Sequence, residues 1–373
     1  MSTLKVDSIE SRTSGNRVVL PDTNNYPPFR NIVINGDMSI NQRVASSVTV
    51  NSGSLQYPVD RIAGRGTSSA GVFTLEQSTT APDNFTNSVK ATVTTNATPG
   101  TNDTYRFVHH IEGNYVKNLN WGSASAKTVT LSFKVRSSVT GTFGGAIING
   151  GYDRFYNFSY IIGSADTWTD VSVTIPGDTS GTWPTDKTLG IRLSLSLGAG
   201  SGEVGSTGSW GTATYEGATG QTNLIETNGA TWYITGLQFE IGDTATPFEF
   251  LPIDVNQTRC ERYYQKSYDT STAPGTGTEN GKRSTGGHQG STTTGYIEGD
   301  VTFTVRMRTA PTITGYDNAG TSGQCNRLAT GVNRYNNNAV SFARITDRAA
   351  NVYSVSGTAA NCLEVQYVAD AEI

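Results

Sequence analysis

Apolar and polar residues alternate along much of the chain between residues 29 and 252. In residues 128–136 every second side chain is apolar, and the same alternation recurs in residues 171–175 and 191–197. This period of two predicts β-strands with one buried face and one solvated face. A further strand is predicted over residues 232–241, where a phase shift at Gly236 indicates a β-bulge. The pattern therefore predicts an antiparallel β-sandwich or jelly roll.

The rest of the chain divides into a short N-terminal element and a smaller C-terminal region. Residues 1–28 hold two apolar runs around a turn, which predicts a hairpin that must pack on the next domain or on other copies of the chain. Residues 253–268 predict a helix that begins at Asp254 or Asn256. The later alternation predicts a second, smaller sandwich, with strands near residues 301–307, 340–345, 352–355 and 363–368. We therefore expect three units, 1–28, 29–252 and 253–373.

Composition and charge narrow the class of protein. Charged residues make up 16% of the chain, below the ~25% that is usual, and the chain is rich in Thr, Ser, Gly and Tyr. This excludes a coiled coil, and the many aromatic residues argue against disorder. The net charge is −4 without a basic run, so we expect no nucleic-acid partner. Because the chain has neither a membrane-length apolar run nor an apolar leader, we expect it to fold in a cytoplasm.

The cysteines and histidines do not predict a metal site or a catalytic site. Cys260, Cys325 and Cys362 lack metal-ligand spacing with the histidines, and three inert buried thiols are favoured over a Cys325–Cys362 disulfide. His109 and His110 are neighbours on a predicted strand, so their side chains should point to opposite faces.

Aromatic residues are the best candidates for a binding surface, because flat rings stack on sugars while polar groups pair with hydroxyls. Residues 152–160 alternate aromatic side chains onto one face, for which core packing or a subunit interface is the favoured interpretation. Residues 198–230 predict a long surface loop, in which Trp210 either packs back onto the sandwich or faces a ligand. The candidate glycan-binding residues are Trp210, Tyr215, Trp183 and Tyr156. The residues expected in the core are Trp168, Phe133 and Trp232.

Three segments carry a resemblance to a known family. The first is NIVINGDMSINQR at 31–43 with YPVDR at 57–61. The second is LQFEIGDTATPFEF at 237–250, which leads into CERYYQ at 260–265. The third is FTVRMRTAPT at 303–312, with ADAEI at 369–373. In this order the segments resemble bacteriophage tail fibres and related virion adhesion proteins, and residues 3–9 resemble the starts of fibres that attach to the particle.

Residues 31–252 also resemble jelly-roll carbohydrate-binding modules. The matching features are the opening Asn35, Gly36 and Asp37, the strand at 129–135, Trp168 with residues 171–176, and the closing strand at 232–241. Such modules often hold a structural calcium ion between acids near both ends. Asp37 matches the first position, but residues 233–236 stand where the family usually has paired aspartates, so no cofactor is expected.

The resemblance implies a virion protein that is assembled in the host cytoplasm. It implies a tail fibre that attaches to a host-surface polysaccharide without covalent chemistry. It also implies a homotrimer whose N-terminus contacts other tail proteins. The alternatives are a head fibre or capsid decoration protein, and a glycan-degrading tailspike, whose two acids the sequence does not single out.

Overall fold

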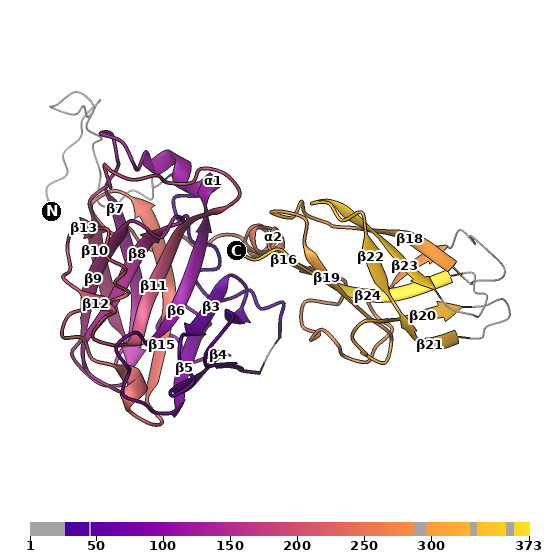
Figure 1. Ribbon diagram of the computed structural model, residues 1–373, viewed down its shortest axis with the longest axis horizontal. Helices are drawn as coiled ribbons and strands as arrows, with labels where there is room; N and C mark the ends of the chain where they lie inside the picture. The colour runs from indigo at the N-terminus through magenta and orange to yellow at the C-terminus, as the bar shows by residue number, and fades with distance from the viewer. Residues whose placement is uncertain (1–26, 45, 287–295, 329–333, 356–361) are drawn as a thin grey trace, which may run out of the picture.

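The computed structural model describes residues 27–373, apart from residues 45, 287–295, 329–333 and 356–361. The hairpin expected within residues 1–28 lies outside the described residues, apart from residues 27 and 28. Two β-rich bodies of unequal size lie side by side and are joined through a short helix (Figure 1). This confirms the all-β prediction. Within the described residues, no helix is long and apolar enough to cross a membrane.

The larger body is a sandwich of two antiparallel sheets, as predicted for residues 29–252. Sheet A has the order β1 (Val48–Val50), β4 (Val72–Ser78), β5 (Ser88–Thr95), β15 (Thr231–Ile241), β7 (Val129–Ser137) and β10 (Thr169–Ile175). Sheet B has the order β13 (Trp210–Gly211), β9 (Phe155–Ile162), β8 (Gly141–Asn149), β11 (Leu189–Ala199), β6 (Thr104–Glu112), β3 (Ile62–Gly66) and β2 (Gln56–Val59). Some neighbouring strands are consecutive in the sequence, but β15 pairs with β5 and β11 pairs with β6, as in a jelly roll.

The facing sides of the two sheets form one apolar core. Phe133 on β7 and Trp232 on β15 are 2% and 0% exposed, as predicted. The pairing of β15 with β7 shifts register between Thr235 and Gln238, which confirms the bulge at Gly236. The ends of this sandwich carry α1 (Gly113–Val116) with η1 (Lys117–Leu119), and η2 (Leu224–Glu226).

The segment predicted to be a surface loop, residues 198–230, is more ordered than expected. It forms β13 and a parallel pair, β12 (Val204–Gly205) with β14 (Gly217–Ala218). Leu224 and Ile225 of η2 are fully buried in the core of the sandwich. The segment has no core of its own and is instead held by the core of the sandwich.

The predicted helix is shorter than expected. The helix α2 spans Ile253–Glu261, and its N-cap is Pro252, so neither Asp254 nor Asn256 begins it. Tyr264 to Lys266 form strand β16, which pairs with β24 (Cys362–Asp370). Aromatic residues favour a strand, and pairing with β24 decides the conformation here over any local helical preference.

The smaller body is a second sandwich, as predicted. Its larger sheet contains β16, β24, β20 (Gln324–Leu328) and β21 (Arg334–Ala339), with β17 (Arg283–Gly286) and β19 (Thr312–Tyr316) also paired to β24. The second sheet has the order β18 (Tyr296–Thr302), β23 (Ala349–Val355) and β22 (Ser341–Ala343). The strand predicted for residues 301–307 ends at Thr302, although Phe303 and Met307 remain buried. All three cysteines are free thiols, with Cys260 and Cys325 buried and Cys362 half-buried.

The segments that resemble virion proteins meet where the two sandwiches join. Arg43 pairs with Glu372 at 3.1 Å, and its guanidinium lies 3.9 Å from the centre of the Tyr264 ring. Arg61 also pairs with Glu372 and lies 3.5 Å from the centre of the Tyr263 ring. Each arginine therefore contacts residues of both other segments. The three segments that carry the resemblance therefore form the buried joint between the sandwiches.

Candidate functional site

Two of the four predicted glycan-binding residues lie inside the larger sandwich. Trp183 and Tyr156 are 6% and 5% exposed. The Trp183 ring packs edge-on against Trp121, with 4.6 Å between ring centres. A sugar could not reach these two rings without opening the core. This agrees with the core-packing interpretation that the sequence favoured for residues 152–160.

Trp210 is half-buried and completes the same aromatic cluster. Its ring centre lies 5.2 Å from that of Trp121, 5.4 Å from that of Trp183 and 5.3 Å from that of Tyr156. Its indole N–H donates a hydrogen bond of 2.7 Å to the carbonyl of Pro176. Trp210 therefore packs back onto the sandwich. Trp121, near the centre of the cluster, follows the short η1 helix and carries no strand pattern that would have identified it.

Tyr215 is also half-buried and holds the covering segment on the outer side of sheet B. Its ring lies against Gly205, where a side chain could not fit, because an added Cβ would lie 2.0 Å from the ring. Asn157 on β9 donates hydrogen bonds to the carbonyls of Tyr215 and Gly217, at 3.0 and 3.2 Å.

A buried ion cluster fixes that segment to the same side of sheet B. The Glu216 carboxylate lies 2.6 Å from guanidinium nitrogens of both Arg106 on β6 and Arg192 on β11. Burial lowers the pKa of Arg106 to about 10, although Glu216 opposes this effect. The chain itself therefore covers this part of sheet B, and an open binding surface has to be sought elsewhere.

The outer side of sheet A carries an open groove of about 240 Å³. Its floor is formed by outward side chains of the neighbouring strands β7 and β10. Ser132 lies directly opposite Ser172, and Lys134 lies opposite Asp170. Lys134 and Asp170 form an ion pair of 2.5 Å in which the Asp170 side chain is 80% exposed. The hydroxyl, ammonium and carboxylate groups therefore line one surface of the groove.

Phenylalanine rings form one wall of this groove. Phe85 and Phe248 line it, and their ring centres are 5.2 Å apart. Phe250, which is 53% exposed, packs against both rings. Gly236 makes this wall possible, because it has φ +64° and an added Cβ would lie 2.9 Å from the Phe85 ring. The bulge in β15 thus leaves room for an aromatic ring above the sheet.

Trp168 extends the same outer face, which corrects the prediction that it is buried. It is half-buried, and its ring packs edge-on against Tyr233, with 6.2 Å between ring centres. The reason is that side chains alternate between the two faces along β10. Val171 and Ile175 face the core, so Trp168 shares the outward direction of Asp170 and Ser172. The alternation in the sequence contained this signal.

Together these groups have the chemistry that a sugar requires. Phe85 and Phe248 form the aromatic wall of the groove, and two serines, Lys134 and Asp170 line its floor. Trp168 lies on the same outer face, two residues before Asp170. Aromatic side chains supply apolar contact area, while a few fixed polar groups set the orientation of a ligand. We name this surface, made by Phe85, Phe248, Trp168, Lys134 and Asp170 with the two serines, the sheet-A groove.

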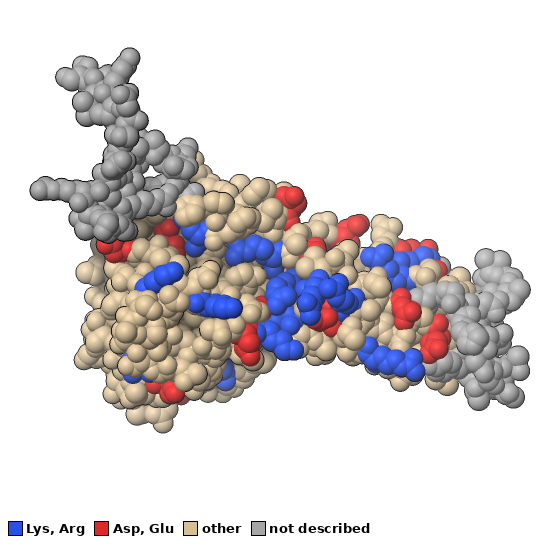
Figure 2. All heavy atoms as spheres, turned by 90° about the horizontal axis from the view of Figure 1, so that it is seen from above, with Lys and Arg blue, Asp and Glu red and all other residues tan. Residues whose placement is uncertain are grey.

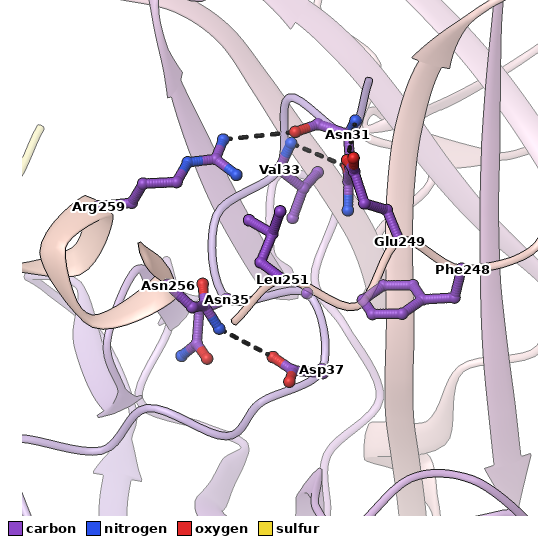
Figure 3. Close-up of a pocket in the computed structure, with 10 residues that line it drawn as sticks. Asn31, Val33, Asn35, Asp37, Phe248, Glu249, Leu251, Asn256 and Arg259 are labelled. Carbon is purple, nitrogen blue, oxygen red and sulfur yellow. Dashed lines mark hydrogen bonds between the residues drawn. The ribbon is translucent and has the colours of Figure 1, made fainter. Parts of the chain in front are cut away.

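A second, smaller pocket lies between residues 31–37 and the segment that leads into α2 (Figure 3). Its polar groups are largely paired with one another. Arg259 donates to the Asn31 carbonyl at 3.3 Å, and Glu249 accepts hydrogen bonds from the backbone N–H groups of Phe29 and Asn31. This pocket is a joint between chain segments.

Asp37, the residue that matches the first calcium position of carbohydrate-binding modules, lines this second pocket. The Asp37 carboxylate accepts a hydrogen bond of 3.2 Å from Asn256 (Figure 3). Among the described residues, no group of three or more His, Cys, Asp or Glu side chains could hold a metal ion.

The two adjacent histidines point to opposite faces of β6, as predicted. The Nδ1 of His109 lies 3.1 Å from the Arg61 carbonyl oxygen, and that of His110 lies 2.7 Å from the backbone oxygen of Ile373. Burial lowers the pKa of both imidazoles, that of His110 to about 3. Both rings are therefore neutral and structural at pH 7.

Comparisons with known proteins find only distant similarity to solved structures. No family model matches the sequence, and no curated protein matches it. Solved structures that resemble it include a putative sugar binding protein from Bacteroides thetaiotaomicron, at 13% identity and TM-score 0.31, over 57% of this chain and 100% of that one. A family 11 carbohydrate-binding module from Clostridium thermocellum has 10% identity and TM-score 0.27, over 52% and 96%.

A third similar structure is the enzymatically active domain of tailspike protein 4 of bacteriophage CBA120. Its identity is 10% and its TM-score 0.28, over 58% of this chain and 22% of that one. This chain therefore aligns with about a fifth of the tailspike domain. TM-scores this low do not establish a shared function.

Proposed function

We propose that this chain binds a host-surface polysaccharide through the sheet-A groove and acts as a bacteriophage attachment protein, most specifically a tail fibre. The observation that carries the binding part is the groove, where an aromatic wall stands beside the exposed Asp170 and Ser172 and the half-buried Lys134 and Ser132. Trp168 lies on the same outer face of sheet A, two residues before Asp170. A ring that stacks on a sugar contributes roughly 1–2 kcal/mol by covering apolar area. Such weak contacts hold a particle when they are repeated.

The virion part of the proposal rests on the three segments that resemble phage adhesion proteins. We propose that the chain is assembled into the particle in the host cytoplasm as a homotrimer, and that residues 1–28 contact other tail proteins. Deleting residues 1–28 should then leave a folded protein that no longer enters virions. Labelled protein seen on the capsid in micrographs, rather than on the tail, would indicate a head fibre or decoration protein instead.

The binding part is tested with immobilised bacterial surface polysaccharides and the full chain. Trp168→Ala and Phe248→Ala should each weaken binding about tenfold, the equivalent of one lost stacking contact. Ile161→Ala is the matched control, because Ile161 is 67% exposed on β9 of sheet B, outside the groove. Equal binding by all three variants would contradict the assignment of the groove.

We also propose binding without cleavage. Incubating the chain with the polysaccharide it binds should leave the length of the polymer unchanged. Shortened fragments that appear with time would instead identify a glycan-degrading tailspike.

A further inference from the structure

Basic side chains from both sandwiches gather where the two bodies meet (Figure 2). Lys187 comes from the segment before β11 in the larger sandwich. Arg306 and Arg308 follow β18 in the smaller one, and Arg348 lies in the turn before β23. Arg308 ties the two sides together, because its Nη1 donates a hydrogen bond of 2.9 Å to the Lys187 carbonyl. We call these four residues the junction cations.

The positive charge at this place is incompletely balanced. Arg306 pairs with Asp347 at 2.7 Å. Lys187 and Arg348 also lie close enough to lower the pKa of Asp347, although Arg306 is the main cause. In the described part of the chain, neither Lys187 nor Arg348 forms an ion pair of its own.

Neither Arg308 nor Asp186 adds an ion pair that would balance the positive charge. The Arg308 guanidinium donates to the carbonyls of Lys187, Ala371 and Glu372, which carry no full charge there. Asp186 is the neighbouring acid, and its carboxylate accepts hydrogen bonds from the backbone N–H and hydroxyl of Thr188. Glu112 and Glu372 also act on Arg308, but they form ion pairs with Arg262 and with Arg43 and Arg61. The exposed side of the junction therefore holds more cations than carboxylates, in a chain whose overall charge is −4.

The junction cations are accessible and partly fixed in place. Lys187 and Arg348 are exposed, and the Arg306 side chain is 61% exposed. Arg308 is half-buried and is held in place by its three carbonyl partners, whereas the other three side chains are exposed. Guanidinium groups match the geometry of carboxylates and phosphates, and a lysine adds a point charge.

We propose that the junction cations bind the carboxylate or phosphate groups of an anionic polysaccharide. Charge complementarity selects this occupant, because the patch is positive on a chain that is negative overall. This proposal depends on the proposed glycan-binding function in one respect only, which is that the natural polymer comes from the host surface. A polymer held both here and in the sheet-A groove would gain from two linked contacts.

The test measures binding of the full chain to three polymers at low ionic strength. These are polygalacturonate for carboxylates, a phosphomannan for phosphates and dextran as the neutral reference. We expect both or one of the anionic polymers to bind, dextran not to bind through this site, and added salt to weaken the binding. Lys187→Glu and Arg348→Glu should each weaken the binding about tenfold.

Lys127→Glu is the matched control. Lys127 is exposed and lies just before β7 in the larger sandwich. The Lys127→Glu variant has the same net charge as each junction variant. We expect its affinity for the anionic polymers to stay within about twofold of that of the unmodified chain. Equal weakening by all three variants, unchanged binding in the junction variants, or no binding of either anionic polymer would overturn the proposal.

The two proposals fail separately. If the anionic polymers bind through Lys187 but no bacterial surface polysaccharide binds, the junction site stands and the attachment function fails. If a surface polysaccharide binds through Trp168 and Phe248 while the anionic polymers do not bind, the junction site fails and the attachment function stands.

Discussion

The indole of Trp210 contacts three other aromatic rings and donates its N–H to a carbonyl, so its stability role can be measured directly. Trp210→Ala removes these ring contacts and should lower the free energy of unfolding by about 2–4 kcal/mol. Chemical denaturation of the purified variant checks this value. If phage that carry the variant also adsorb poorly, the lower stability explains the loss. Unchanged stability together with lost adsorption would instead support the prediction that Trp210 contacts the glycan.

His110 gives the protein a pH dependence whose direction follows from its burial. The folded chain keeps this imidazole neutral down to a pKa of about 3, whereas an unfolded histidine takes up a proton near pH 6.5. The unfolded state therefore binds more protons below pH 6.5, and the free energy of unfolding falls by about 1.4 kcal/mol per pH unit from this group. His109 acts in the same direction, while burial raises the pKa of Asp60 to about 6, which acts in the opposite direction.

His110→Asn isolates this contribution, because an amide can still donate to the backbone oxygen of Ile373. Between pH 6.5 and pH 5, the variant should lose less stability than the unmodified chain. Thermal unfolding of both proteins across this range is the measurement. Parallel curves would show that His110 is not the buried neutral group described here.

At the scale of elements, the bulge in β15 connects the fold to the sheet-A groove. A β-strand without the bulge would present a side chain where Phe85 lies, and the aromatic wall would not form. Gly236 thus links a backbone irregularity, which is visible in the sequence as a phase shift, to the surface that we propose binds a polysaccharide.

Gly236→Ala tests that link. The new Cβ would meet the Phe85 ring at 2.9 Å, and alanine is strained at a φ of +64°. Gly229→Ala is the matched control, because Gly229 has φ +74° with no atom within 4 Å of an added Cβ. Both variants should lose about 1 kcal/mol of stability to backbone strain, but only Gly236→Ala should also weaken polysaccharide binding. Equal binding by the two variants would separate the bulge from the groove.

At the scale of the whole molecule, the two sandwiches are coupled by buried ions. Glu372 forms ion pairs with both Arg43 and Arg61, whose guanidinium groups also lie over the Tyr264 and Tyr263 rings. Asp370 is a second partner of Arg43, at 3.3 Å. Because one acid serves two buried cations from another part of the chain, its loss would affect both bodies.

Glu372→Gln should lower the free energy of unfolding by about 3–5 kcal/mol, because it leaves two buried positive charges with less compensation. Glu279→Gln, which removes an exposed partner of Lys282, should cost at most about 1 kcal/mol. Denaturation followed by tryptophan fluorescence reports on the larger sandwich in both variants. A Glu372 effect no greater than that of Glu279 would mean that the joint is not stabilised by its ions.

The sequence by itself determined the all-β class, the two sandwiches, the bulge at Gly236 and the burial of Phe133 and Trp232. Alternation with a period of two is a local property, since it depends only on which side of a strand each residue faces. The same parity would also have placed Trp168 outside, beside Asp170 and Ser172. Only the tertiary structure decided the end of α2, because pairing with β24 made Tyr264 a strand residue. It also decided the packing of Trp210, the position of Phe85 over Gly236 and the gathering of the junction cations. These depend on contacts between residues far apart in the chain, which no local pattern contains.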